Sequence, residues 1–378
     1  MRVAPAAVAV VLLLPVAACA GEPEAAAPAP QTATHEQHSA VAAPPLRPGE
    51  RFADLTVAQP YTPVPPNGGT DEYRCMVLDP QVAHRTYLTG SQFEPQNVAI
   101  AHHALVFSVP PAGAAAARAR DAADPGEGYT CFGDAGLDDT TWVDTWTPNV
   151  AETLLDGDLG YVLDPGSLLI LQVHYNLLTA GAGGPPADRS NLRLRLTDGT
   201  PRTVALATTP LMAPIELPCG TGETGALCDR ATAVADVEKR FGDAGEASAL
   251  LQRCSGGAAK PGTTQRCDHP IPGPMTVYAA RGHMHMLGRA ISIELNPGTP
   301  AARTLLDVPA FDFDNQALRV LPEPVTLKAG DTVRVTCTHD ASLRRQIPQL
   351  RKLPPRYVVW GEGTSDEMCL GLLTTSSA

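Results

Sequence analysis

The chain has 378 residues, which is enough for two ordinary domains with cores of their own. Its formal net charge of −12 argues against nucleic acid as a partner, because a nucleic-acid-binding surface needs an excess of Lys and Arg. Only 5% of the residues are aromatic, and 33 glycines and 37 prolines interrupt any long helical pattern. This composition favours an all-β protein with many turns.

The first residues predict an export signal. Arg2 supplies a positive charge, and residues 8–16 form an apolar core that is too short to span a bilayer as a mature helix. The core ends in Val-Ala-Ala followed by Cys19, which resembles a bacterial lipobox. We therefore expect a signal peptide over residues 1–18 and a lipid on Cys19 that anchors an exported protein to the cell envelope, in the periplasm or at the cell surface. An ordinary signal peptide that contains Cys19 is the alternative.

Residues 19–50 are rich in Ala and Pro and show no apolar periodicity. A segment of this composition is typical of a flexible linker, so we interpret it as a tether between the lipid and the folded part of the chain. The composition becomes globular from Asp71 onward, where Asp-Glu-Tyr-Arg-Cys-Met-Val-Leu predicts a strand.

Two later apolar stretches also predict strands, and both contain histidines. Residues 98–109 carry His102 and His103, and residues 168–176 carry His174. Burying an imidazole costs free energy unless another group binds it. Because neighbours on a regular strand point to opposite faces, His102 and His103 can share one site only at a twist or a bulge. A single histidine such as His174 is more often an ordinary core residue.

A helical pattern interrupts the strands between Cys219 and Cys267. Apolar residues recur there at intervals of three and four positions, from Val234 to Leu251. Two glycines within the pattern weaken the helix. We expect a small helical insertion over about residues 219–267, stapled by the cysteines near its ends.

The stretch from Arg281 to Arg289 carries the motif on which the functional interpretation depends. Its His283 and His285 lie two residues apart and lead into an alternating apolar pattern that predicts a strand. Residues two apart on a strand face the same side, so both imidazoles point toward one place while Met284 turns away. Such a pair can form half of a metal site, although two ordinary histidines fit the same pattern.

Of the nine cysteines, eight remain once Cys19 is set aside. An even set in an exported chain indicates up to four disulfides formed in an oxidising compartment. Spacing alone leaves their pairing open, because eight cysteines allow 105 connectivities. The eight are Cys75, Cys131, Cys219, Cys228, Cys254, Cys267, Cys337 and Cys369.

Five motifs, in this order, resemble the copper type II, ascorbate-dependent monooxygenases, the family of peptidylglycine α-hydroxylating monooxygenase and dopamine β-monooxygenase. Imidazole and thioether groups are ligands that suit copper. The motifs span residues 71 to 369 and comprise the D-x-Y-x-C pattern of Asp71 to Cys75, the pair His102-His103, the sequence Leu-Gln-Val-His-Tyr of 171–175, His283-Met284-His285, and Ser-Asp-Glu-Met-Cys of 365–369.

The resemblance implies an all-β fold with two jelly-roll-type β-sandwich domains in tandem, each holding one copper ion. We place the N-terminal, electron-transfer domain over residues 51–206 and the C-terminal, O2-activating domain over residues 207–378, with the insertion inside the second. The implied ligands are His102, His103 and His174 for the first copper, and His283, His285 and Met368 for the second.

The resemblance also implies the reaction. Ascorbate or a similar reductant supplies electrons to both coppers, O2 binds at the site that contains Met368, and a C–H bond of a small-molecule substrate is hydroxylated. Gln172, two residues before His174, is the candidate for a role in electron transfer. Cys337 is expected to pair with Cys369, which would hold Met368 in place, and Cys75 is expected to pair with Cys131.

Three positions near the second site bear on the substrate. Arg281 stands where the family's peptide hydroxylase has an arginine that meets the substrate carboxylate, which makes it a candidate substrate-binding residue; a structural role is equally open. Leu370 and Leu372 stand where that enzyme has an asparagine and a tyrosine that hold the peptide. These departures favour a substrate that is more apolar than a peptide.

A non-catalytic copper-binding or storage lipoprotein of the cell envelope is the alternative hypothesis. It would use the same ligands, and Met284 and Met286 would suit it. Ascorbate-dependent O2 uptake separates the two hypotheses, because only the monooxygenase consumes O2.

Overall fold

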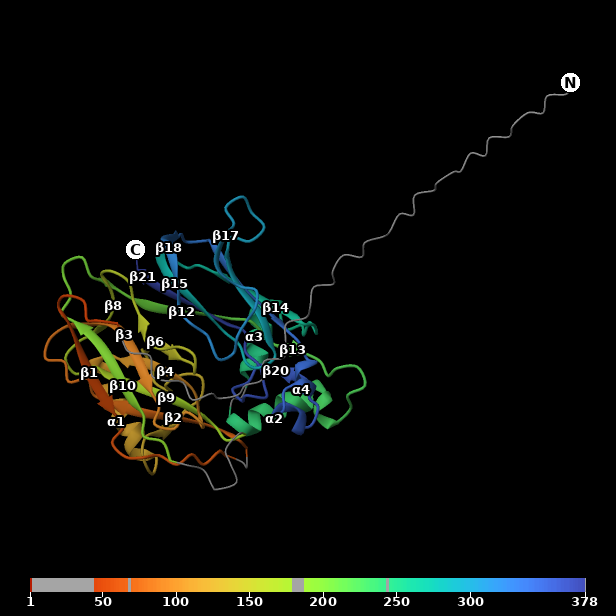
Figure 1. Ribbon diagram of the computed structural model, residues 1–378, viewed down its shortest axis with the longest axis horizontal. Coiled ribbons are helices and arrows are strands. Elements are labelled where there is room, and N and C mark those ends of the chain that lie inside the picture. Colours follow the sequence, from red (N-terminus) through yellow and green to blue (C-terminus); the bar gives the residue numbers. More distant parts are fainter. Residues whose placement is uncertain (2–43, 67–68, 179–186, 243–244, 378) are drawn as a thin grey trace. The chain divides into compact units, whose positions relative to one another are not determined.

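The computed structural model describes residue 1 and residues 44–66, 69–178, 187–242 and 245–377. The predicted signal peptide, Cys19 and most of the predicted linker lie outside these residues. The described residues from 44 to 377 belong to one compact unit. Antiparallel β-sheets dominate this unit and helices are few, which confirms the mostly β character predicted from composition (Figure 1).

Strands from the first half of the chain form two sheets. One has the order β1-β10-β3-β8-β11, with β7 beside β3, and the other has the order β5-β2-β9-β4-β6. All pairs are antiparallel except β8 with β11. The elements are β1 (Glu50–Thr56), β2 (Asp71–Leu78), β3 (Thr86–Glu94), β4 (Ala101–Val109), α1 (Ala114–Ala123), β5 (Tyr129–Thr130), β6 (Thr141–Trp146), β7 (Thr153–Leu154), β8 (Leu159–Leu163), β9 (Leu168–Asn176), β10 (Asn191–Thr197) and β11 (Val204–Ala205).

Strands from the second half form two four-stranded sheets and one strand pair. The sheets have the orders β12-β21-β15-β18 and β14-β19-β16-β17, and β13 pairs with β20. The strands are β12 (Ala207–Met212), β13 (Glu216–Leu217), β14 (Thr264–Pro270), β15 (Met275–His283), β16 (Gly288–Leu295), β17 (Arg303–Val308), β18 (Arg319–Leu327), β19 (Thr332–His339), β20 (Val358–Val359) and β21 (Leu370–Ser377). Among the described residues, no sheet contains strands from both sides of residue 206. The two jelly-roll domains remain a prediction.

The segment predicted to be a helical insertion forms two helices, α2 (Arg230–Phe241) and α3 (Glu246–Ser255). Asp229 caps the first turn of α2 by accepting a hydrogen bond from the backbone N–H of Thr232. Gly242 ends α2 with φ +70°, a left-handed conformation that favours glycine. A short helix, α4 (Leu343–Gln346), lies closer to the C-terminus. No helix of the described chain is both long enough and apolar enough to cross a membrane.

Four disulfides close the fold: Cys75–Cys131, Cys219–Cys228, Cys254–Cys267 and Cys337–Cys369. The first and last are the pairs that the resemblance implies. The other two flank the helices of the insertion. Four disulfides are typical of an exported protein that folds in an oxidising compartment.

Strand β9 places two polar residues, Gln172 and His174, among apolar core residues. All nine of its residues are buried, since β2 and β4 pair with it on both edges and both of its faces are covered. Leu169, Leu171, Val173 and Tyr175 point into one core cluster, and Leu168 and Ile170 point into another. By the alternation of a strand, Gln172 and His174 share the face of Leu168 and Ile170.

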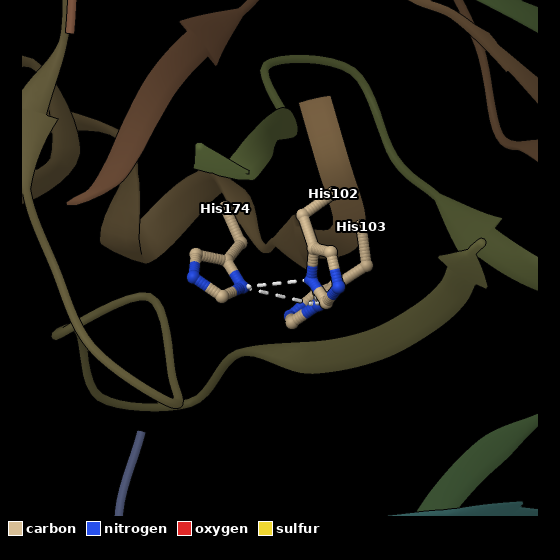
Figure 2. A group of neighbouring side chains, drawn as sticks. All are labelled: His102, His103 and His174. Atoms are coloured by element: carbon tan, nitrogen blue, oxygen red, sulfur yellow. Dashed lines mark hydrogen bonds between the residues drawn. The ribbon is translucent and has the colours of Figure 1, made fainter. Parts of the chain in front are cut away.

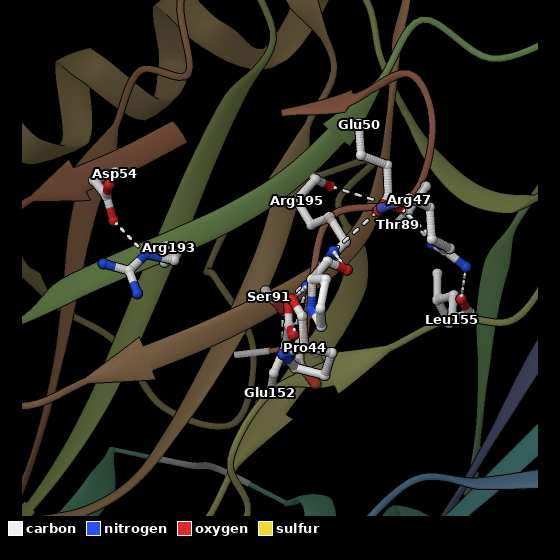
Figure 3. A network of polar contacts seen from close by, with 12 residues as sticks. Pro44, Arg47, Glu50, Asp54, Thr89, Ser91, Glu152, Leu155, Arg193 and Arg195 are labelled. Carbon is white, nitrogen blue, oxygen red and sulfur yellow. Dashed lines mark hydrogen bonds and ion pairs between the residues drawn. The ribbon is translucent and has the colours of Figure 1, made fainter. Parts of the chain in front are cut away.

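A buried ion network ties the N-terminal strand to the sheet (Figure 3). The guanidinium of Arg195 on β10 is fully buried and donates two hydrogen bonds to Glu152, both of 2.9 Å, and one of 3.0 Å to Glu50. It also donates to the backbone carbonyl of Pro44 at 2.8 Å. Although burial raises the pKa of Glu50, hydrogen bonds from Arg47, Thr89 and Arg195 outweigh it and lower that pKa to about 2. The ionised network is therefore part of the folded state.

Replacing Arg195 tests the contribution of this network. Arg195→Met removes the cation and leaves two buried carboxylates without it, so we expect the free energy of unfolding to fall by about 3–5 kcal/mol. The matched control is Arg193→Met, two positions away on the same strand, whose side chain is one-third exposed and pairs with Asp54. We expect that change to cost about 0–1 kcal/mol. Urea denaturation of both variants is the measurement, and equal losses would contradict this view of the network.

Candidate metal centre

A β-bulge brings His102 and His103 to one site. In the pairing of β4 with β9, Ala101 stands opposite Tyr175 and His103 opposite His174, so two residues of β4 face a single step of β9. The irregularity turns both imidazoles of the adjacent pair toward His174. This is the departure from regular strand geometry that the sequence requires if the two histidines are to act together.

The three Nδ1 atoms of His102, His103 and His174 form a triangle with sides of 3.3 Å (Figure 2). All three side chains are buried, and their ligand atoms fit the spacing of a metal site. A point at the centre of such a triangle lies about 1.9 Å from each nitrogen, close to the length of a metal–imidazole bond. The residues therefore fit a metal ion bound through three nitrogens.

The carboxylate of Asp71 on β2 fixes the orientation of His174. The Nε2–H of His174 donates to Asp71 at 2.9 Å, which leaves the lone pair of Nδ1 directed at the other two histidines. The side chains of Asn176 and Thr364 also donate to Asp71, at 2.8 and 2.7 Å. Burial raises the pKa of Asp71, but its hydrogen bonds, above all the one from His174, lower that pKa overall. Tyr73 stacks on the His174 ring at 4.1 Å.

His283 and His285 form the second group, and each has one ring nitrogen committed to the protein. His283 is the last residue of β15 and pairs with Leu370, the first residue of β21, which places the strand end beside the Met368 segment. The Nδ1–H of His283 donates to Gln316 at 2.7 Å. The Nδ1 of His285 contacts the carbonyl of Asp366 at 3.3 Å, and its Nε2 is buried without a hydrogen-bond partner in the described part of the chain.

A buried carboxylate joins the two segments that carry the predicted ligands. Glu367 is fully buried and accepts hydrogen bonds from the backbone N–H groups of His285, Leu287 and Met368, at 2.9, 2.6 and 3.3 Å. The imidazole of His339 lies 3.3 Å from the same carboxylate. The disulfide Cys337–Cys369 fastens β19 to the residue that follows Met368. These contacts give the Met368 segment a defined position next to His285.

The surroundings lower the pKa of three of these histidines and so disfavour their charged form. Burial, followed by repulsion from His174 and other imidazoles, lowers the pKa of His103 well below its usual range. Burial and the nearby His285 lower the pKa of His283 to about 3. Burial also lowers the pKa of His285, against the opposing charge of Glu367. Neutral imidazoles are the form that binds metal ions, so their ligand atoms are available at neutral pH.

The two groups of histidines lie next to each other. The ring centroids of His103 and His283 are 5.5 Å apart. Phe313 lies between the groups, with its ring 4.6 Å from His102 and 6.3 Å from His285. The six predicted ligands therefore form two clusters with direct ring contact. The order of the motifs along the sequence does not predict this proximity.

A cavity of roughly 620 Å³ opens onto both groups. His103, His283 and Met368 all line it, together with the predicted electron-transfer residue Gln172. Gln172 donates to the carbonyl of Asp134 at 2.9 Å and contacts the sulfur of Cys131 at 3.3 Å. Met284 is buried in the apolar core and is not among the residues that line this cavity.

Arg281 is engaged with residues of the first half of the chain. Its guanidinium is buried and donates to the carbonyl of Thr145 at 2.6 Å and to the carboxylate of Asp144 at 3.2 Å. Arg281 is not among the residues that line the large cavity. It lines a smaller one, together with Leu372, whereas Leu370 faces the large cavity.

Sequence reasoning overlooked the residues that orient the histidines. Asp71 belongs to a quoted motif, but its role as a hydrogen-bond acceptor depends on a partner 103 residues away. Gln316, Glu367 and His339 also act across the fold. Glu367 stands in a quoted motif beside Met368, but the polar stretch before it, residues 361–366, gave no signal that its carboxylate is buried.

Comparison with known proteins relates the C-terminal half to one family. Residues 262–374 match the family model "Copper type II ascorbate-dependent monooxygenase, C-terminal domain". These residues include His283, His285 and Met368. A comparison with curated proteins finds no match.

Similarity to solved structures is distant. PNGF-II is 12% identical with a TM-score of 0.32, and the match covers 86% of this chain and 65% of that one. Latent PorU from Porphyromonas gingivalis is 10% identical with a TM-score of 0.14, covering 82% and 24%. The 7S globulin of Momordica charantia is 10% identical with a TM-score of 0.15, covering 87% and 74%. The chain spans less than two thirds of the first two, and similarity at these TM-scores carries no argument.

Copper binding by single variants tests the first histidine group. We expect His102→Ala and His174→Ala each to retain one copper ion fewer per chain than the wild type, because two imidazoles hold the ion much less tightly than three. The control is His84→Ala, an exposed histidine that pairs with Asp198. Copper is measured by atomic absorption after dialysis. Full copper retention in both site variants would rule out this group as a metal site.

Proposed function

We propose that this chain, whose residues 262–374 match the C-terminal domain of the copper type II ascorbate-dependent monooxygenases, hydroxylates a substrate C–H bond with O2, using two mononuclear copper sites and electrons from ascorbate or a similar reductant. The observation that carries the proposal is that members of both histidine groups and Met368 line one cavity. The reaction balances as one O2, two electrons and two protons, which convert R–H to R–OH and one water.

His102, His103 and His174 would hold the electron-transfer copper. Their Nδ1 atoms face one another at equal distances, and the bond from His174 to Asp71 keeps one of them in the correct tautomer. Gln172, on the same strand face as His174, lies beside this group. Three buried imidazole nitrogens would hold an ion whose role is to exchange electrons.

His283, His285 and Met368 would hold the second copper, which supplies the activation of O2 when it is bound. Three protein ligands leave a coordination position open, as a catalytic metal site requires. The thioether of Met368 is a soft ligand that favours the reduced ion. Gln316 and the carbonyl of Asp366 hold the Nδ1 sides of the two imidazoles, so the opposite nitrogens are the ones left for the metal.

The contact between His103 and His283 supports electron delivery between the sites. Hydroxylation consumes two electrons, and a mononuclear copper site supplies one at a time. A ring-to-ring separation of 5.5 Å leaves no gap for solvent between the two imidazoles. These two side chains would therefore provide a short path from the first site to the second.

We extend the proposal to the setting of the enzyme. The two sites would belong to jelly-roll-type domains over residues 51–206 and 207–378, in keeping with the change of sheet membership near residue 206. The partners would be a small-molecule substrate, O2 and a membrane reached through a lipid on Cys19. The alternative, a copper-storage lipoprotein, gives no reason for a cavity of roughly 620 Å³ beside Met368.

The substitution Met368→Ala tests the catalytic site. We expect it to retain the copper ion of the histidine triangle and to abolish ascorbate-dependent O2 uptake, because the second site loses its thioether ligand. Met275→Ala is the control, since Met275 is a partly buried residue of β15 outside the cavity lining. O2 uptake is followed with an oxygen electrode and copper by atomic absorption. Undiminished uptake by Met368→Ala would place the catalytic site elsewhere.

A further inference from the structure

The helical insertion supplies one wall of the large cavity. Phe241, the last residue of α2, and Glu246, the first residue of α3, both line it. The lining also includes Phe132, His103 and His283. A segment that has no counterpart among the recognised motifs therefore faces the predicted ligands.

Aromatic contacts lead from the insertion to the first histidine group. The ring of Phe241 meets Phe132 edge-on at 5.4 Å, and Phe132 meets Tyr73 edge-on at 5.8 Å. Tyr73 in turn stacks on His174 at 4.1 Å. Edge-on aromatic pairs stabilise each other beyond the area that they bury. Phe241 is thus held in place by a ring contact with the first half of the chain.

Ion pairs fasten the same helix to the segment that carries Met368. Arg240 donates to the buried carboxylate of Asp366 at 2.7 Å and to Asp236, one turn earlier, at 2.9 Å. Arg356 lies 3.4 Å from Asp366 and also pairs with Asp236. Since the carbonyl of Asp366 contacts His285, the position of α2 is tied to the second histidine group. These contacts therefore join the helix that lines the cavity to the second histidine group.

The lining of the cavity defines a chemical class of ligand. Five of its residues are Phe or Trp, contributed by both halves of the chain: Phe107, Phe132, Trp142, Phe241 and Trp360. The charged lining residues are three carboxylates, Asp134, Glu246 and Glu362, against one guanidinium, Arg120. An aromatic lining favours a ring-bearing apolar ligand, and the excess of carboxylates disfavours an anion.

We propose that the insertion is the substrate-selecting wall of this enzyme, and that Phe241 and Phe132 together select a ring-bearing apolar substrate without a carboxylate. The inference rests on the proposed function, because it takes the cavity beside Met368 as the place where the substrate is hydroxylated. It assigns the specificity to α2 and not to Arg281, whose guanidinium is engaged with Asp144.

Binding of two matched probes to the full chain, copper-loaded and copper-free, tests the proposal. The probes are 2-naphthylmethanol and 2-naphthoate, which share a ring system and differ in charge, and isothermal titration calorimetry gives their affinities. In the copper-free chain, where no metal ion attracts a carboxylate, we expect the alcohol to bind about tenfold more tightly than the carboxylate, because the lining carries an excess of like charge against the anion. We expect Phe241→Ala to weaken binding of the alcohol by about tenfold, since it removes an aromatic surface.

Two further variants keep the result interpretable. Phe241→Leu retains an apolar side chain that protects the fold, and we expect it to lose affinity for 2-naphthylmethanol while its copper content stays at the wild-type level. Phe52→Ala, on β1 outside the cavity lining, should bind both probes as the wild type does. Wild-type affinity in both Phe241 variants, or equal binding of the two probes, would overturn the proposal. Because binding is measured without ascorbate, this failure is distinct from an absence of O2 uptake, which would instead contradict the proposed function.

Discussion

The structure depends on how it buries imidazoles side by side. Five histidines lie together in the interior, where an unpaired polar atom costs free energy. At three of the five rings a polar group on the far side meets this cost: Asp71 holds His174, Gln316 holds His283, and the carbonyl of Asp366 contacts His285. Each contact occupies one nitrogen and directs the other toward its neighbours. The same arrangement that satisfies the buried rings therefore prepares a set of ligand atoms.

Glu367 holds together the segments that form the second site. A carboxylate that accepts backbone hydrogen bonds from both His285 and Met368 holds two segments more than 80 residues apart in a fixed relation. Cys337–Cys369 adds a covalent restraint beside it. The neighbouring residue Asp366 connects this segment to α2, because its carboxylate accepts a hydrogen bond from Arg240. Site, disulfide and insertion are thus parts of one network, which explains how a helical segment can influence a cavity formed mainly by strands.

The parts of the fold that could be predicted from the sequence are those encoded locally. An apolar run identified the strand that carries His174, and alternation identified β16, the strand that follows His285. Helical spacing indicated the insertion that forms α2 and α3, and the resemblance implied the pairs Cys75–Cys131 and Cys337–Cys369. The bulge at His102 was recognised as a requirement but could not be predicted, because it depends on the register with β9. Arg281 shows the same limit: its ion pair with Asp144 joins residues 137 positions apart. The contact between His103 and His283 likewise arises from packing between sheets that no local pattern encodes.

The central claim is that this chain inserts an oxygen atom from O2 into a C–H bond. Its most direct test is mass spectrometry of the products that the copper-loaded protein forms from a panel of ring-bearing and aliphatic compounds, with ascorbate and isotopically labelled O2. The account predicts an alcohol that carries one labelled oxygen atom, formed only when copper and ascorbate are both present. A product whose oxygen comes from water, or no product from any compound of the panel, would contradict it.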